Sequence, residues 1–359
     1  MAKTPLRIGL VGTGRGSVYG RLFAELADSV IVACCDTDPR RMEQFQRELG
    51  LSDSACFCKF DRFLDTEMDA VVIGTPMDHH APGAIAALKA GFHVLSEVTA
   101  ASSVAECEQL VDAVRRTGKT YMMAENCVYW PFIQQWIDIV AEGRLGDIFY
   151  CECEYLHPIE ALIVDPSTGQ QTWRAKQPPL HYCTHSLGPI LEITKDRIVR
   201  AMGIGQGNRL LPGGGLGGID IQVALFQTER NALIKMLRSS IAPREPSIHF
   251  YLLQGTNGFI ETDRKGPGGK GWLYVKGEMA KAESIDCSFT DESLPEAVRQ
   301  IGHGSAEYGV AREFLDAIKA GRQPSLNELR AVQLTAPGLI AHESAARGGV
   351  WLDVPSFQD

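Results

Sequence analysis

The sequence has 359 residues, of which 45% are hydrophobic and 22% charged, and its formal net charge is −9. This length allows two domains, and the composition is that of an ordinary globular protein. The negative charge argues against a nucleic-acid partner or an anionic membrane surface. No apolar run reaches the roughly 18 residues of a membrane span, so no membrane partner is expected.

The ten cysteines lie mainly in apolar or strand-like runs such as Val32–Cys35, and no pair has the spacing of a zinc or redox motif. The first residues enter a strand pattern directly, without the apolar region of a signal peptide. Reduced thiols and the lack of such a region predict a cytoplasmic protein.

Residues 1–125 are expected to form an α/β Rossmann domain with a doubly wound parallel sheet, because strand and helix patterns alternate there. The predicted strands cover residues 6–12, 30–36, 56–59, 70–74, 92–97 and 120–124. The predicted helices cover residues 17–26, 39–49, 81–90 and 104–116.

Residues 126–359 are expected to form an α+β domain with a large, mostly antiparallel open sheet, whose closing helices pack back. The predicted strands cover residues 148–156, 199–204, 219–227, 232–237, 249–254 and 272–276. The predicted helices cover residues 132–142, 306–320 and 326–347. Glycine clusters, such as that at 255–258, separate the strands. The glycine run 213–218 lacks the Lys-Ser/Thr of a phosphate-binding loop and is therefore predicted to be an ordinary loop.

A glycine-rich stretch, Gly12-Thr13-Gly14-Arg15-Gly16-Ser17, follows the first strand and opens a helix. Gly12 permits the tight turn, and Gly14 lets the backbone approach a pyrophosphate at the helix N-terminus. Asp36 ends the second strand, where a carboxylate binds the adenosine ribose hydroxyls and repels a 2′-phosphate. The sequence therefore predicts NAD, in contact with Gly12, Gly14, Arg15, Gly16, Ser17 and Asp36.

At Gly74-Thr75-Pro76, His80 and Ser96–Ala100, the chain resembles the Gfo/Idh/MocA family of sugar oxidoreductases, and the resemblance covers essentially the whole length. The family combines a Rossmann domain with an open-sheet domain, whose face commonly supports oligomerisation. The resemblance thus implies a homo-oligomer, a dimer or a tetramer. It adds these residues to the predicted cofactor contacts: Thr75, Pro76, His80, Glu97 and Asn126.

One departure concerns the catalytic lysine of this family. Most of its dehydrogenases have Glu-Lys-Pro after the fifth strand, whereas this chain has Glu97-Val98-Thr99. Valine cannot transfer a proton, so the protein either is not an active dehydrogenase or takes its acid–base groups from elsewhere.

A narrower resemblance is to glycoside hydrolase family 109, the NAD-dependent glycosidases, whose corresponding stretch Glu-Val-Pro-Ala-Ala is similar to Glu97–Ala101. That family has a Tyr-x-His motif and a Tyr-Pro-Thr-His motif in its active site. This chain has Tyr155-Leu156-His157 and Tyr182-Cys183-Thr184-His185, with Cys183 in place of proline. The resemblance thus implies catalytic roles for Tyr155, His157, Tyr182 and His185.

The mechanism that this resemblance implies begins with transfer of a hydride from C3 of a bound sugar to NAD. The leaving group at C1 is then eliminated and water adds, so that the net reaction is glycoside cleavage with NAD recycled. One alternative is an NAD(P)-dependent sugar or polyol dehydrogenase with net oxidation, and another is a non-catalytic dinucleotide-binding protein. The missing lysine disfavours the dehydrogenase, and the two Tyr/His motifs disfavour the non-catalytic protein.

A loop before the second motif contains candidate contacts for a small carbohydrate or glycoside substrate: Trp173, Arg174, Lys176 and His181. His303 is a further candidate site residue. His157 and His185 lack the His-x-x-His and His-Glu-x-x-His spacings of metal sites, so no metal is predicted.

Overall fold

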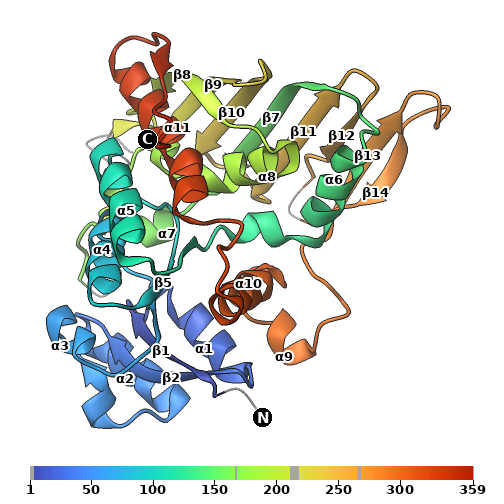
Figure 1. The fold of residues 1–359 in the computed structure, drawn as a ribbon. Coiled ribbons are helices and arrows are strands. Elements are labelled where there is room, and N and C mark those ends of the chain that lie inside the picture. Colours follow the sequence, from blue (N-terminus) through green and yellow to red (C-terminus); the bar gives the residue numbers. More distant parts are fainter. Residues whose placement is uncertain (1–3, 166–167, 211–217, 266–267, 359) are drawn as a thin grey trace. The chain divides into compact units, whose positions relative to one another are not determined.

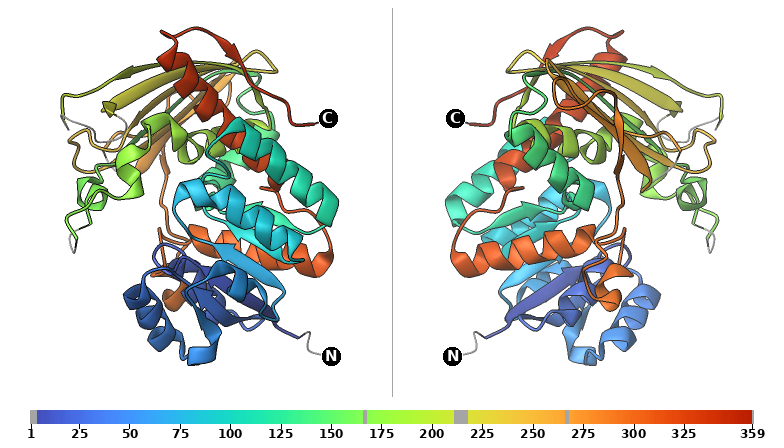
Figure 2. Two further views of the ribbon diagram at one scale, coloured as in Figure 1. Left: turned by 90° about the vertical axis from the view of Figure 1, so that its left-hand side faces the viewer. Right: turned by 90° about the vertical axis from the view of Figure 1, so that its right-hand side faces the viewer.

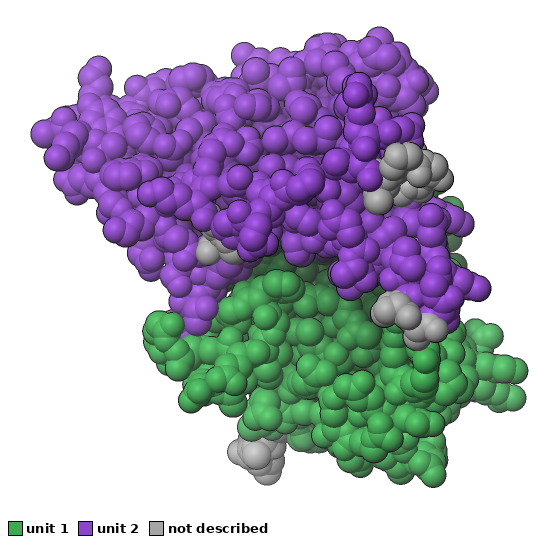
Figure 3. Space-filling model, turned by 180° about the vertical axis from the view of Figure 1, so that it is seen from behind, with its two compact units in different colours: residues 1–129, 292–332, 358 green, residues 130–291, 333–357, 359 purple. Residues whose placement is uncertain are grey.

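The computed structural model describes residues 4–165, 168–210, 218–265 and 268–358. The chain divides into two compact units, coloured separately in Figure 3. Unit 1 contains residues 1–129, 292–332 and 358, and unit 2 contains residues 130–291, 333–357 and 359. Most of the glycine run 213–218, predicted to be a loop, lies outside the described residues.

Unit 1 contains a six-stranded parallel sheet with the strand order β3-β2-β1-β4-β5-β6 (Figure 1). Its strands are β1 (Leu6–Val11), β2 (Ser29–Cys35), β3 (Cys56–Phe57), β4 (Ala70–Ile73), β5 (His93–Ser96) and β6 (Tyr121–Met123). Its main helices are α1 (Ser17–Glu25), α2 (Pro39–Leu49), α3 (Phe60–Leu64), α4 (His80–Lys89) and α5 (Val104–Thr117). The strand order reverses between β1 and β4, where Rossmann domains bind dinucleotides, and the predicted Rossmann fold is confirmed.

Local sequence signals set the bounds of these elements. All residues of β4 are buried, as expected for a strand covered by helices on both faces. Helix α2 begins after Asp38, whose side chain accepts a hydrogen bond from Arg40 N, and ends at Gly50, with φ of 65°. The predicted strand 56–59 is shorter in the structure because α3, which the sequence analysis missed, begins at Phe60.

The structural division of the chain differs from the predicted boundary at residue 125. Residues 292–332, with α9 (Glu296–Arg299) and α10 (Ala306–Ala320), belong to unit 1. The ring centroid of Phe314 on α10 lies 6.4 Å from that of Phe23 on α1, and Asp28 forms an ion pair with Arg312 at 2.8 Å. The apolar stripe of α10 was evident in the sequence, but periodicity does not tell against which sheet or helix a stripe packs.

Unit 2 contains a nine-stranded sheet with the order β14-β13-β12-β11-β7-β10-β9-β8-β15. Its strands are β7 (Ile148–Leu156), β8 (Ile198–Gln206), β9 (Ile221–Thr228), β10 (Leu233–Ser239), β11 (Ile248–Gly255), β12 (Gly258–Thr262), β13 (Lys270–Val275), β14 (Glu283–Asp286) and β15 (Leu352–Asp353). Strands β7 and β10 pair in parallel and the other adjacent described strands are antiparallel, which confirms the mostly antiparallel sheet. Strands β12, β14 and β15 were missed, and the cluster 255–258 is the turn of the β11–β12 hairpin.

The two faces of this sheet differ. Cys151 and Cys153 of β7 point to the buried face, on which α6 (Pro131–Ala141) and α8 (Thr184–Thr194) lie (Figure 2). The opposite face contains exposed apolar side chains, namely Ile204, Val223, Leu233 and Trp272. Unit 2 also contains the short helix α7 (Glu160–Ile163). The last helix, α11 (Glu328–Ala346), begins in unit 1 and ends in unit 2.

None of the helices in the described parts of the chain combines the length and the apolar character that crossing a membrane requires.

Candidate active site

The glycine-rich loop between β1 and α1 has the backbone geometry of a dinucleotide site. Gly12 has φ of 82°, and a Cβ atom there would lie 2.5 Å from Gly74 O. A Cβ atom on Gly16 would lie 2.5 Å from Gly12 O, so both positions require glycine. Ser17 is the first residue of α1, and its Oγ donates to Gly14 O at 2.8 Å. The first turn of α1 therefore follows a tight loop, and the positive end of its helix dipole suits a pyrophosphate.

Asp36 follows β2 and is oriented by this loop. Its Oδ2 accepts hydrogen bonds from Thr13 N at 2.7 Å and Thr13 Oγ1 at 2.8 Å, and its Oδ1 accepts from Asp38 N at 2.8 Å. The neighbouring Arg40 pairs with Asp38 at 3.2 Å, and Arg41 with the same carboxylate at 3.6 Å. The negative charge that repels a 2′-phosphate therefore stays in place beside the loop.

Arg15, Glu97 and Asn126, three predicted cofactor contacts, are brought together in unit 1. Arg15 Nε lies 2.8 Å from Glu97 Oε1, and Arg15 NH2 lies 3.0 Å from Glu307 Oε1. Asn126 Nδ2 donates to Glu307 Oε1 at 3.0 Å. His303 N donates to Glu307 Oε2 at 2.9 Å, and His303 Nδ1 lies 2.8 Å from Glu307 Oε1. Glu307 thus links α10 to the glycine-rich loop.

Charge dominates this cluster. Burial favours the neutral form of Glu307, but the hydrogen bonds and charge of His303, together with the charge of Arg15, outweigh it and lower the pKa to about 2. Burial also disfavours the charged form of Arg15, but Glu97 and Glu307 raise its pKa. Glu307 was not among the predicted site residues, because it lies on a helix of the distant segment 292–332 and no motif marks it.

His80, predicted to contact the cofactor with Thr75 and Pro76, is buried at the start of α4. One ring nitrogen lies 2.8 Å from Thr99 O and the other 2.9 Å from Thr75 O. Burial lowers its pKa, although both carbonyls act against this shift. The ring connects the segment after β4 to the segment after β5, and a contact with the cofactor stays a prediction.

In unit 2, the four predicted catalytic residues form two tyrosine–histidine pairs. Tyr155 is near the end of β7, and its hydroxyl lies 2.7 Å from Nδ1 of His157. The hydroxyl of Tyr182 lies 3.1 Å from Nε2 of His185, the second residue of α8. The ring centroids of Tyr155 and His185 are 5.8 Å apart, and those of Tyr155 and Tyr182 are 6.5 Å apart. The two motifs, separate in sequence, therefore meet in one group.

Cys183, which replaces the proline of the family motif, has a packing role. It is fully buried at the N-cap of α8, and its Sγ lies 3.3 Å from Leu334 O of α11. A Cβ atom on Gly338 of α11 would lie 2.4 Å from this sulfur. This close approach of α11 to residue 183 holds the start of α8, which carries His185.

Two residues of this group were missed, Arg238 and His249. The strand register places Arg238 of β10 beside Tyr155 on one side and His249 of β11 beside it on the other. Both occupy positions at which their strands otherwise turn apolar or aromatic side chains to the buried face, as Met236 and Tyr251 do. A charged residue at a strand position where the alternation predicts an apolar one was the signal that could have revealed Arg238.

The predicted substrate contacts do not all join this group. Trp173 and Arg174 belong to one short 3-10 helix, and the guanidinium lies 4.4 Å above the indole. Lys176 of the same helix is exposed. The ring of His181 packs against that of His342 with centroids 4.7 Å apart, and burial with the neighbouring His342 lowers its pKa to about 4.

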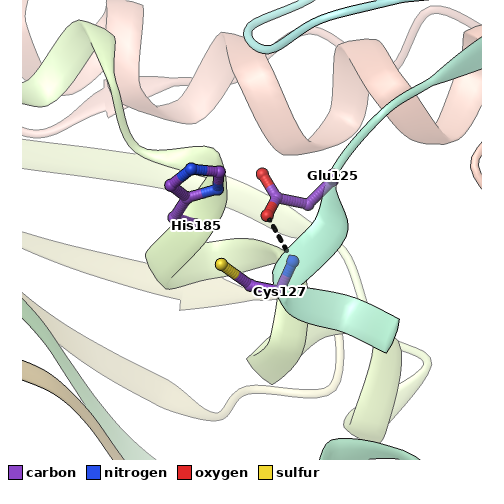
Figure 4. A group of neighbouring side chains, drawn as sticks. All are labelled: Glu125, Cys127 and His185. Atoms are coloured by element: carbon purple, nitrogen blue, oxygen red, sulfur yellow. Dashed lines mark hydrogen bonds between the residues drawn. The ribbon is translucent and has the colours of Figure 1, made fainter. Parts of the chain in front are cut away.

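Figure 4 shows the segment that follows β6 in unit 1, together with His185 of unit 2. Cys127 N donates a hydrogen bond to Glu125 Oε1 at 3.2 Å, which fixes the carboxylate over its own backbone turn. Both residues are buried, and Glu125 directly precedes Asn126 of the charge cluster.

Comparison with known proteins identifies unit 1. Residues 6–125 match the family described as "Oxidoreductase family, NAD-binding Rossmann fold", the Gfo/Idh/MocA family. The match assigns residues 6–125 to the NAD-binding domain of the Gfo/Idh/MocA oxidoreductases. The Gly12–Ser17 loop is therefore part of an NAD-binding domain, as predicted.

Similarity to other proteins in sequence and structure also extends beyond residues 6–125. A glycosyl hydrolase family 109 protein from Shewanella pealeana is 32% identical over 285 residues, which cover 70% of this chain and 62% of that protein. The alpha-N-acetylgalactosaminidase of Tannerella forsythia is 25% identical over 98% of this chain and 86% of its own length. An inositol dehydrogenase homologue from Azotobacter vinelandii, solved with NADH and myo-inositol, is 22% identical with a TM-score of 0.80 and 98% coverage of both chains, and it shows the shared fold.

Proposed function

We propose that this protein is an NAD-dependent carbohydrate-active enzyme that cleaves glycosides through transient oxidation at C3 of the sugar. The observation that carries the proposal is the group of two tyrosine–histidine pairs in unit 2, combined with Val98 at the position of the usual catalytic lysine. The glycosyl hydrolase family 109 relatives support this reaction class.

The residues of unit 1 fit the cofactor. The geometry at Gly12 and Gly16 admits a pyrophosphate, and the carboxylate of Asp36 is held at the end of β2 for the ribose hydroxyls. When bound, NAD supplies a reversible hydride acceptor. The predicted cofactor residues thus keep their roles as binding groups in the proposal, and Glu97 and Asn126 act through the cluster around Arg15.

The residues of unit 2 supply the proton transfers. A hydroxyl proton leaves the sugar as its C3 is oxidised, and a C2 proton leaves before the C1 group departs. Tyr155 with His157, and Tyr182 with His185, are two acid–base pairs at hydrogen-bond distance. Tyrosine and histidine suit this chemistry when their surroundings adjust their proton affinities, and the pair of carboxylates of ordinary glycosidases is not needed.

The substrate contacts belong to the same proposal. Trp173 and Arg174 form a stacked aromatic–cation pair that suits the apolar face and the hydroxyl groups of a sugar, with Lys176 and His181 nearby in sequence. The low pKa of His181, about 4, keeps this ring neutral at physiological pH, so it would contact a sugar as a neutral donor and acceptor.

Cellular context and assembly are further parts of the proposal. The ten cysteines, all within the described residues, are thiols rather than disulfides, and eight of them are buried, which suits a reducing cytoplasm. The exposed apolar side chains of one sheet face, at Ile204, Val223 and Trp272, suit association of identical copies as a dimer or tetramer.

A second candidate function is net oxidation of a sugar or polyol, which the NADH-bound inositol dehydrogenase homologue of similar fold keeps open. A deuterium experiment separates the two. The enzyme is incubated with p-nitrophenyl glycosides and a catalytic amount of NAD in deuterated water. Glycoside cleavage releases many equivalents of nitrophenol per NAD and places deuterium at C2. Stoichiometric NADH without nitrophenol would instead show a dehydrogenase, and NAD binding without turnover of a broad glycoside panel would show a non-catalytic protein.

Variants test the assigned residues in this assay. Tyr182→Phe and His185→Ala should each lower turnover by about a hundredfold, because removal of a general acid or base typically costs this much, while NAD affinity stays unchanged. Tyr274→Phe is a matched control, since Tyr274 lies on β13 outside this group. Full activity of either site variant would remove that residue from the mechanism.

A further inference from the structure

Tyr155 is the middle member of a row of three polar side chains across the unit 2 sheet. Its neighbour on β10 is Arg238 and its neighbour on β11 is His249, both directly opposite it in register. The Arg238 guanidinium lies 4.2 Å from the centroid of the Tyr155 ring, and the His249 ring stacks on it with centroids 3.9 Å apart at 25°. Fixed strand pairing therefore holds a cation against the ring of a proposed catalytic tyrosine.

Arg238 is buried, with 3% of its surface exposed. It donates hydrogen bonds to the backbone carbonyls of Tyr155 at 3.2 Å and of Tyr182 at 3.4 Å, and also to that of Ser239. Within the described part of the chain, no carboxylate forms an ion pair with it. Burial lowers its pKa, and Tyr155 and Tyr182 act against this shift.

A buried guanidinium without an anion is costly, because an uncompensated charge in a low-dielectric interior loses its hydration. Carbonyl groups compensate only part of this loss. A phenolate is the anion within reach, since deprotonation of tyrosine spreads negative charge into the ring that lies under the guanidinium. The second tyrosine, Tyr182, has its ring centroid 5.6 Å from the same group and is the more distant candidate.

We propose that Arg238 is a positioning residue that favours the phenolate form of Tyr155 and so makes this tyrosine the base of the proton transfer. The role of Tyr155 as a base rests on the proposed function. The effect of Arg238 on the ionisation of Tyr155 does not, because it needs no substrate. The proton of the sugar hydroxyl moves to Tyr155 Oη, and the hydroxyl passes it to His157 Nδ1, which lies 2.7 Å away.

Other titratable side chains of unit 2 lie around Tyr155. Three histidines and one tyrosine have their rings close to it: His157, His185, His249 and Tyr182. Tyr251 lies beside His249, and Cys183 is near Arg238. Arg238 carries a permanent positive charge, which none of these side chains does, so the effect on Tyr155 is assigned to Arg238.

A tyrosinate titration tests this charge effect without substrate. The absorbance change on deprotonation is recorded for the wild type and for Tyr155→Phe, and the difference gives the titration midpoint of Tyr155. In Arg238→Met this midpoint should rise by at least about one pH unit, and in Arg238→Lys, which keeps the charge, by less. Arg264→Met is the matched control: Arg264 lies 4.0 Å above the Phe250 ring on the other face of the sheet and should leave the midpoint unchanged.

A second measurement serves if Arg238→Met does not fold, as judged by circular dichroism. Tyr251 is also buried, and its hydroxyl donates to His185 O at 2.5 Å, so Tyr251→Phe gives a second midpoint in the wild-type background. Tyr155 should titrate below Tyr251. A folded Arg238→Met protein with an unchanged Tyr155 midpoint, or a wild-type Tyr155 that titrates no lower than Tyr251, would overturn the inference.

Activity then gives an independent readout. If the enzyme cleaves glycosides, Arg238→Met should move the acidic limb of the kcat/KM pH profile, on which activity rises as the base loses its proton, upward by the same one unit, and Arg238→Lys should restore part of it. A purely structural role of Arg238 would lower activity without moving this limb. If no glycoside is cleaved, the proposed function fails while the titration result still decides the inference.

Discussion

Replacement of Glu307 by glutamine tests how much the charge of this buried side chain stabilises unit 1. The variant keeps the side-chain shape but removes the charge that faces Arg15 and His303. The pKa of Glu307 falls from 4.5 to about 2 in the folded protein. At about 1.36 kcal/mol per pH unit, this difference corresponds to about 3 kcal/mol of folding free energy.

The sign of the pH dependence follows from the direction of this shift. Because the folded protein holds the carboxylate more strongly ionised than the unfolded chain does, the stabilisation is fully present above about pH 5 and is lost as the pH falls towards about 2. About 2 kcal/mol of it should be lost by pH 3. The difference in unfolding free energy between wild type and Glu307→Gln should therefore shrink from pH 7 to pH 3.

Urea denaturation followed by circular dichroism at pH 7, 5, 4 and 3 measures this difference. Glu313→Gln is the control, since Glu313 is on the same helix and pairs with the half-exposed Arg322 at 2.8 Å. Its loss should cost less than about 1 kcal/mol, as for most surface pairs. A Glu307→Gln effect below about 1 kcal/mol at pH 7, or one that stays constant down to pH 3, would refute the reasoning.

Three further predictions concern other parts of the chain. Asp36→Ala should weaken NAD binding about tenfold in calorimetry and leave NADP binding unchanged or tighter, because the carboxylate beside the loop favours a free ribose hydroxyl. Equal losses of affinity for both cofactors would contradict this. Trp272→Asp should shift the protein to a smaller species in light scattering if the exposed sheet face joins copies, and an unchanged mass would exclude this position from the interface. The ring of His181 should show no NMR titration above pH 5, because the folded protein keeps it neutral. The wild type should therefore lose unfolding free energy as the pH falls from about 6.5 to 4, and His181→Asn should lose less of it over this range.

Much of unit 1 was determined by local sequence. Its strands are short apolar runs bounded by turns, and Gly12, Gly16 and Asp36 mark the cofactor loop through backbone needs that few other residues meet. Such signals are local, since a tight turn or a helix cap involves residues a few positions apart. The Tyr-x-His and Tyr-x-x-His motifs were likewise visible, because each pair is adjacent along the chain.

The long-range partners of these residues were decided by tertiary structure. Periodicity gives the buried face of α10 but not its target, so Glu307 could not be placed beside Arg15, nearly 300 residues earlier in the chain. Strand register decides which side chains stand opposite each other, and a shift of one residue would turn Arg238 away from Tyr155. The charge that acts on the proposed base therefore depends on a pairing between β7 and β10 that no short stretch of sequence encodes.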